Sequence, residues 1–155
     1  MKLLRHPANE QNCLVYAAAM ILEIEPDEIF NYCGHRGQDI WWRHAAGDNK
    51  KRGFHIQEII DFTLSKGMGL CPLELYPRSS PAGWESRAKV IWDHLYCKMR
   101  FVNTLQDYRA ILITPHHALA WDNLSNRVYD PNGLIRKIEG LDVIEAWLLL
   151  KSNQI

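Results

Sequence analysis

The apolar positions in the first part of the chain recur at helical spacing. This pattern predicts helices over residues 12–22, 26–33, 54–67 and roughly 84–98. Asn12 is the expected N-cap of the first helix, and Glu10 places a negative charge near its positive end. The expected buried face of this helix consists of Leu14, Ala17, Ala18, Ile21 and Leu22. The third helix is expected to bury Ile56, Ile59, Ile60 and Leu64.

The later part of the chain has a different pattern, because short β-rich segments alternate with turn residues. We expect antiparallel strands over residues 109–114, 117–122 and 126–131, an edge strand over 70–77 and a closing helix over 141–151. The polar, glycine-punctuated segment 35–53 is expected to be a long irregular loop. Helices first and strands later predict a single α+β domain over residues 1–155.

Composition and charge exclude several classes of protein. The chain has 155 residues, of which 47% are hydrophobic and 23% charged, which excludes a disordered or collagen-like chain. Because 18 basic residues balance 18 acidic ones, we expect no bulk attraction to nucleic acid or to an anionic membrane. With no evident signal segment or bilayer-spanning apolar run, we expect a cytoplasmic protein whose four cysteines remain thiols.

The stretch "NEQNC" places a cysteine where the first helix begins. A thiol at a helix N-terminus, and near an imidazolium, has a lowered pKa, so Cys13 is a candidate nucleophile. The side-chain amide of Gln11 could donate to the oxygen of a tetrahedral intermediate, and the backbone N–H of Cys13 is a second donor. Packing of Cys13 as a small core residue is the alternative.

The predicted hairpin "PHHALAWD…RVYDPNG" supplies a base and its orienting group. A four-residue loop would place His117 opposite Asn132 with Asp130 diagonally near, whereas a two-residue loop would place His117 opposite Asp130. Either register gives one imidazole an acceptor that fixes its tautomer. We favour His117 over His116 as the base, because strand alternation groups it with Leu119. Asn132 is the alternative orienting residue, and Asp130 could instead be a plain turn former.

"EQNC" opening a helix, followed by "HHALAWD" and "VYDPNG" on successive strands, resembles the papain-like cysteine peptidases. The resemblance is closest to the branch that trims double-glycine leader peptides from bacteriocin precursors. It implies the papain-like fold, with an N-terminal helical part carrying Cys13 and a C-terminal antiparallel sheet carrying His117 and Asp130. It also implies that Gln11 contributes to the oxyanion hole.

These residues predict a cysteine hydrolase that cleaves a peptide or amide bond of a peptide or protein substrate through a thioester. An acyl transferase or deamidase of the transglutaminase type, or an isopeptidase, would use the same groups. A catalytically silent peptide-binding or protein-binding module is the alternative from another class. We expect no cofactor and no metal, because the cysteines lack paired zinc-ligand spacing. The oligomeric state is left open.

Overall fold

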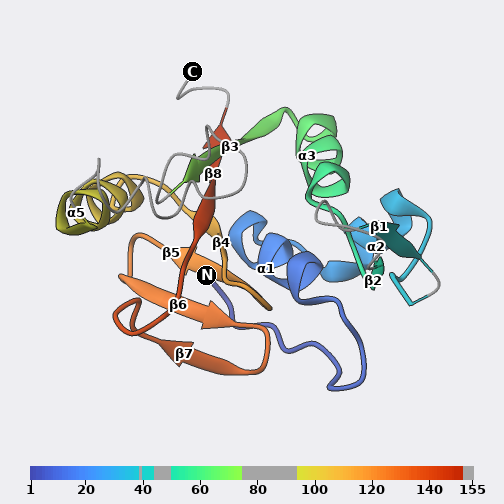
Figure 1. Ribbon diagram of the computed structural model, residues 1–155. Helices are drawn as coiled ribbons and strands as arrows, with labels where there is room; N and C mark the ends of the chain where they lie inside the picture. Colours follow the sequence, from blue (N-terminus) through green and yellow to red (C-terminus); the bar gives the residue numbers. More distant parts are fainter. Residues whose placement is uncertain (39, 44–49, 75–93, 152–155) are drawn as a thin grey trace.

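The fold is known from a computed structural model that describes residues 1–38, 40–43, 50–74 and 94–151 (Figure 1). Within these ranges the helices are α1 (Cys13–Leu22), α2 (Pro26–Cys33), α3 (Ile56–Ser65) and α5 (His94–Leu105). They combine with an antiparallel sheet, so the α+β class is confirmed.

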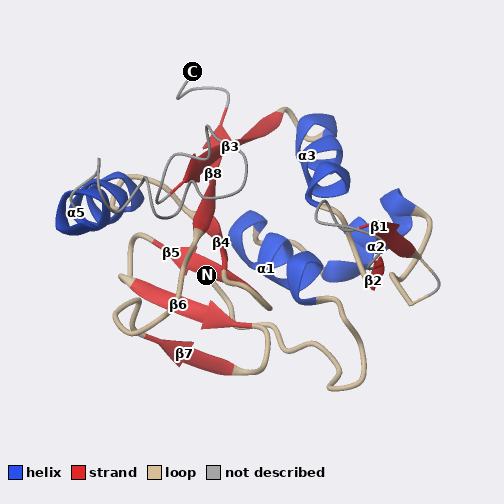
Figure 2. Ribbon diagram, in the orientation of Figure 1, coloured by secondary structure: helices blue, strands red, loops and turns tan. Residues whose placement is uncertain are grey.

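The main sheet has six strands in the order β3-β8-β4-β5-β6-β7, and all neighbouring strands run antiparallel (Figure 2). The strands are β3 (Met68–Glu74), β4 (Ala110–Ile113), β5 (Ala118–Asp122), β6 (Arg127–Asp130), β7 (Leu134–Arg136) and β8 (Glu145–Lys151). A separate two-stranded sheet pairs β1 (Trp41–Arg43) with β2 (Lys50–Arg52). The predicted edge strand is confirmed over residues 70–74, since β3 lies at one edge of the main sheet and contains Pro72, while its predicted part over 75–77 lies outside the described residues.

Two hydrophobic clusters fill the two faces of this sheet. On one face α1 packs against β5 and β4, and its buried residues Ala17 and Ala18 share a cluster with Ala118 and Ala120 of β5. Small side chains on both elements permit a close approach of the helix to the strand. On the other face Phe101 and Leu105 of α5 share a cluster with the alternate residues of β4, β5 and β8. The tight packing of α1 fixes the position of its N-terminal end.

The predicted closing helix is wrong, because residues 145–151 form strand β8 between β3 and β4. In β8, Leu149 belongs to the α1 cluster and Ala146 and Leu148 to the α5 cluster, so both faces are covered. A central strand covered on both faces is a continuous apolar run, and periodicity alone does not distinguish such a run from a buried helix.

Other expectations need smaller corrections. The segment expected to be an irregular loop contains β1 and β2, and β7 was not expected. The helix predicted over 84–98 continues to Leu105, while its predicted part before residue 94 lies outside the described residues. On α3, Leu64 is 61% exposed and Phe62 is buried instead, so the helix is rotated from the expected face.

In α1, Leu14 and Leu22 are only partly buried, whereas the other expected core positions are buried. Asn12 occupies the N-cap position of α1, but its side chain makes no capping hydrogen bond. Its side-chain amide donates to Glu10 instead, at 2.6 Å. Glu10 therefore lies next to the N-cap residue of α1, as expected. The side chain of Asn12 binds Glu10 and does not cap the helix.

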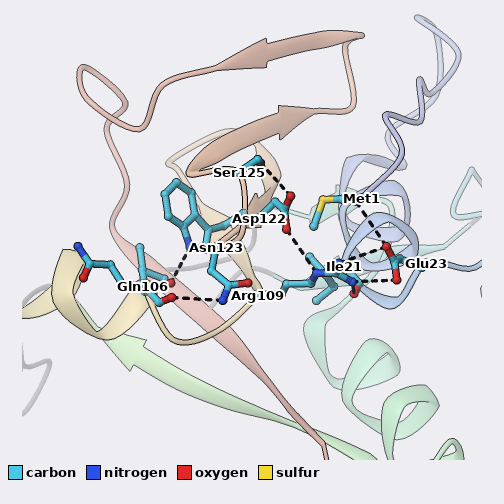
Figure 3. Close-up of polar contacts among 10 residues, drawn as sticks. Met1, Ile21, Glu23, Gln106, Arg109, Asp122, Asn123 and Ser125 are labelled. Carbon is cyan, nitrogen blue, oxygen red and sulfur yellow. Dashed lines mark hydrogen bonds and ion pairs between the residues drawn. The ribbon is translucent and has the colours of Figure 1, made fainter.

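A polar network ties the other end of α1 to the sheet (Figure 3). Arg109 forms ion pairs with Glu23, just after α1, at 3.1 Å and with Asp122 at the end of β5 at 3.4 Å. Ser125 in the following turn donates to Asp122 at 2.8 Å. The α-amino group of Met1 lies 3.4 Å from Glu23. The network therefore holds the N-terminal segment, α1 and the β5–β6 hairpin in one arrangement.

Candidate functional site

A cleft of about 550 Å³ opens at the N-terminal end of α1, opposite the start of β5. Gln11 and Cys13 line it from the helix side, and His116 and His117 line it from the sheet side. Two segments far apart in the sequence thus meet at one cavity, as the sequence hypothesis required. Asn132 also lines the cleft, while Asp130 lies behind His117.

Cys13 is the first residue of α1 and is partly buried. The backbone N–H groups of a first helical turn have no partner within the helix, and they give this end a partial positive charge. A negative charge on the sulfur, or on an oxygen bound beside it, would be stabilised there. Burial of Val15 and Ala17 on the sheet side of α1 keeps the helix in place without enclosing the sulfur.

The imidazole of His117 links Cys13 to Asp130. Its Nε2–H donates to Asp130 Oδ1 at 2.7 Å, so Nδ1 is the ring nitrogen that does not bind the carboxylate. The hydrogen bond with Cys13 is the largest cause that raises the pKa of His117 to about 9. Partial burial lowers that pKa, and the hydrogen bond with Asp130 raises it again. The protonated imidazolium is therefore favoured at neutral pH.

A tight turn places His117 at the start of β5. The backbone N–H of Thr114 donates to the carbonyl oxygen of His117 at 2.9 Å, and the Thr114 hydroxyl donates to the same oxygen at 3.1 Å. This turn reverses the chain between β4 and β5, so His117 lies at the rim of the sheet. His116 is exposed and its neighbour His117 is the one that contacts Asp130.

Asp130 ends β6 and is only 2% exposed. Asp122 pairs with Arg127, so the hairpin has the four-residue loop, and Asp130 is diagonal to His117 as that register predicted. Besides His117, the backbone N–H of Asn132 donates to Oδ1 at 2.8 Å. Arg136 Nη2 lies 3.1 Å from the other oxygen, Oδ2. The carboxylate thus has a fixed orientation and charged partners.

Asn132, the alternative orienting residue, lies farther from the His117 ring than Asp130 does. Its side-chain nitrogen lies 3.5 Å from His117 Nε2, at the limit of a hydrogen bond and farther than the Asp130 oxygen. Its side-chain oxygen accepts a hydrogen bond from His6 Nε2 at 2.9 Å. Asn132 therefore connects the N-terminal segment with the end of the hairpin that carries His117 and Asp130.

Two residues in this region were missed by the sequence analysis, His6 and Arg136. His6 lines the cleft, its backbone N–H donates to the Pro131 carbonyl at 2.9 Å, and its ring centroid lies 6.4 Å from that of His117. No periodic pattern marks the irregular segment that carries His6. Arg136 could have been found if the turn at Gly133 had been extended into a further strand, because β7 begins at the next residue.

The opposite wall of the cleft depends on a close approach to Gln11. Gly53 has a φ of +124°, and a side-chain carbon there would lie 2.8 Å from the Gln11 carbonyl oxygen. Phe54 follows and lines the cleft, stacked on the ring of His35 at 4.5 Å. His35 in turn donates to Glu58 on α3. The segment of Gly53 and Phe54 therefore lies against the backbone of Gln11 at this wall.

Two other cysteines, Cys33 and Cys71, have different surroundings from Cys13. Cys33, which ends α2, is partly buried, and burial followed by the charges of Glu58 and Asp61 raises its pKa to about 11. Cys71 on β3 is exposed. Among the described residues, no three His, Cys, Asp or Glu side chains are grouped so that they could hold a metal ion.

Comparisons of the chain with protein-family models, curated proteins and solved structures find no match. None of the helices in the described ranges is both long and apolar enough to span a bilayer. The functional inference therefore depends on the geometry of the cleft at Cys13.

Proposed function

We propose that the protein is a papain-like cysteine hydrolase that cleaves a peptide or amide bond. Cys13 is the nucleophile, His117 is the general acid and base, and Asp130 orients the imidazole. Gln11 and the backbone N–H of Cys13 bind the oxyanion. The observation that carries the proposal is the cleft that Cys13 and His117 line together, in which the imidazole of His117 donates at 2.7 Å to the buried Asp130.

Each step of the reaction uses groups that line or adjoin the cleft. His117 Nδ1 takes the thiol proton, and the sulfur forms a bond to the carbonyl carbon of the substrate. When the C–N bond breaks, the imidazolium gives its proton to the leaving amine, and a thioester remains. A water molecule then attacks the thioester while His117 accepts its proton. The C–S bond breaks, the acid leaves, and the Cys13 thiolate recovers a proton from His117.

Two further features support this assignment. The raised pKa of His117, about 9, favours the imidazolium at neutral pH, and an imidazolium beside a thiol is the arrangement that activates the sulfur in thiol hydrolases. The order of the elements also agrees with the resemblance, since the helix with Cys13 comes first, His117 directly precedes β5, and Asp130 ends the adjacent antiparallel strand β6.

Peptide cleavage tests the proposal directly. A library of internally quenched peptides is incubated with the wild type, with Cys13→Ala and with the matched control Cys33→Ala. We expect cleavage by the wild type and the control and none by Cys13→Ala. In water enriched in ¹⁸O, hydrolysis should place one ¹⁸O in the new carboxylate. An added amine that captures most of the acyl group would instead indicate a transferase.

The outcome that contradicts the proposal is equally clear. If no peptide, isopeptide or activated ester is turned over, and Cys13 alkylates no faster than the exposed Cys71, the protein is not an acyl-transfer enzyme. The cleft would then be the binding site of a catalytically silent module.

A further inference from the structure

We infer that Arg136 is a positioning residue of the site, which holds Asp130 in place and allows His117 to release its proton during turnover. The inference rests on the proposed function, because it concerns the same three groups. Arg136 does not line the cleft, so its effect would pass through the carboxylate of Asp130.

The fold brings Arg136 to Asp130 through the β6–β7 hairpin. Asp130 pairs with Leu134 and Val128 pairs with Arg136, so Arg136 is the diagonal neighbour of Asp130 on the same face of the sheet. Gly133, with a φ of +94°, makes the turn between the two strands. The arginine Nη2 then lies 3.1 Å from Asp130 Oδ2.

The two oxygens of Asp130 have separate partners. Oδ1 accepts from His117 Nε2 at 2.7 Å and from the Asn132 backbone N–H at 2.8 Å, and Oδ2 faces Arg136. The carboxylate therefore cannot rotate without losing contacts on both sides. Arg136 consequently fixes the plane of the carboxylate as well as its charge.

The charge balance at Asp130 explains why a permanent cation is needed. A carboxylate that is only 2% exposed requires a positive partner. His117 supplies that charge only while it is protonated, and turnover requires it to be neutral when it activates water. Arg136 remains charged throughout, so Asp130 stays compensated when the imidazole loses its proton.

The permanent charge of Arg136 matters most in the acyl-enzyme. The hydrogen bond with Cys13 is the largest cause that raises the pKa of His117, and acylation of the sulfur removes the thiolate. Asp130 is then the main group that retains the proton on the imidazole. Arg136 competes for the same carboxylate, and it thereby makes His117 available as a base for the attacking water.

The experiment is a titration of the His117 imidazole by NMR in the full chain. Arg136→Met should raise the titration midpoint of the His117 imidazole by about one pH unit. We expect no larger shift, because the Arg136 side chain is 42% exposed and its charge is partly screened by solvent. Arg136→Lys should keep the wild-type midpoint. The matched control is Arg127→Met on β6, where the arginine is exposed and donates to the Asn126 carbonyl instead.

The kinetic readout separates positioning from stability. With an activated ester, Arg136→Met should accumulate acyl-enzyme at neutral pH, with its hydrolysis slowed about tenfold and recovered at higher pH. If Arg136→Met does not fold, Arg136→Gln takes its place, with the same expectations. A midpoint that stays the same or falls, or hydrolysis of the acyl-enzyme at the wild-type rate, overturns the inference. Failure of the proposed function is distinguishable, because wild-type Cys13 would then form no acyl-enzyme at all.

Discussion

Cys13 and Cys33 are partly buried cysteines on neighbouring helices, yet their surroundings are opposite. Cys13 begins α1, at the positive end of the helix dipole, and lines the same cleft as His117. Cys33 ends α2, at the negative end, where burial and nearby carboxylates raise its pKa to about 11. Because both thiols are partly buried, we expect any difference in their reactivity to have a cause other than exposure. The helix end that carries each thiol and the charges of its neighbours are the expected cause.

The largest effect should come from exchanging the two cysteines for alanine one at a time. Cys13→Ala should abolish turnover, because Cys13 is the thiol that lines the cleft among the described residues, while Cys33→Ala should retain nearly full activity. Peptide cleavage and circular dichroism of both variants test this. Activity that survives in Cys13→Ala, or is lost in a folded Cys33→Ala, would contradict the assignment of Cys13 as the nucleophile.

The second effect concerns the imidazole that distinguishes the two thiols. His117→Ala should lower kcat/KM by roughly 10²–10⁴, the range expected for loss of a general acid and base. His116→Ala should change it by less than about tenfold, since His116 is exposed and His117 contacts Asp130. Kinetics of both single variants provide the measurement. Equal losses in the two variants would mean that the base was assigned to the wrong histidine.

The third effect is that of Asp130→Asn, which keeps the shape of the side chain but removes its charge. The substitution leaves Arg136 without its counter-ion and weakens the hold on His117. We expect a loss of about 1–3 kcal/mol in the free energy of unfolding and a fall of kcat/KM by at least about tenfold. Urea unfolding and steady-state kinetics measure the two quantities. A variant with wild-type stability and kinetics would exclude Asp130 as the orienting group.

The smallest effect is a pH dependence of stability in which both cysteines take part. The pKa of His117 is raised from 6.5 to about 9 in the folded protein, so its stabilising contribution is complete below pH 6.5 and is lost as the pH rises through about 9. The pKa of Cys33 is raised from 9.0 to about 11, so above pH 9 only the unfolded chain ionises this thiol and stability falls further.

Unfolding midpoints at a series of pH values test this window in wild type and variants. Cys13→Ala should flatten the change between pH 6.5 and 9, because it removes the largest cause of the His117 shift. Cys33→Ala should flatten the change above pH 9 instead. The same curve in both variants would mean that neither thiol is linked to folding in this way.

The first helix and the hairpin with His117 and Asp130 could be predicted because their signals are local. An N-cap position, apolar periodicity and turn residues lie next to each other in the sequence, and the four-residue loop was one of two registers considered. Strand β8 could not be separated from a helix by its pattern, since its position between β3 and β4 buries both of its faces. His6 and Arg136 contact residues of the 130–132 turn, and no local sequence pattern predicts these contacts.

The most direct test of the central claim is the relative rate at which Cys13 and Cys33 are alkylated within one molecule at pH 6. Limited treatment of the folded protein with iodoacetamide, followed by peptide mass spectrometry, gives both rates in one sample. The account predicts that Cys13 reacts more than about tenfold faster than Cys33, and that His117→Ala removes most of the difference. Equal slow labelling of the two thiols, or faster labelling of Cys33, would contradict it.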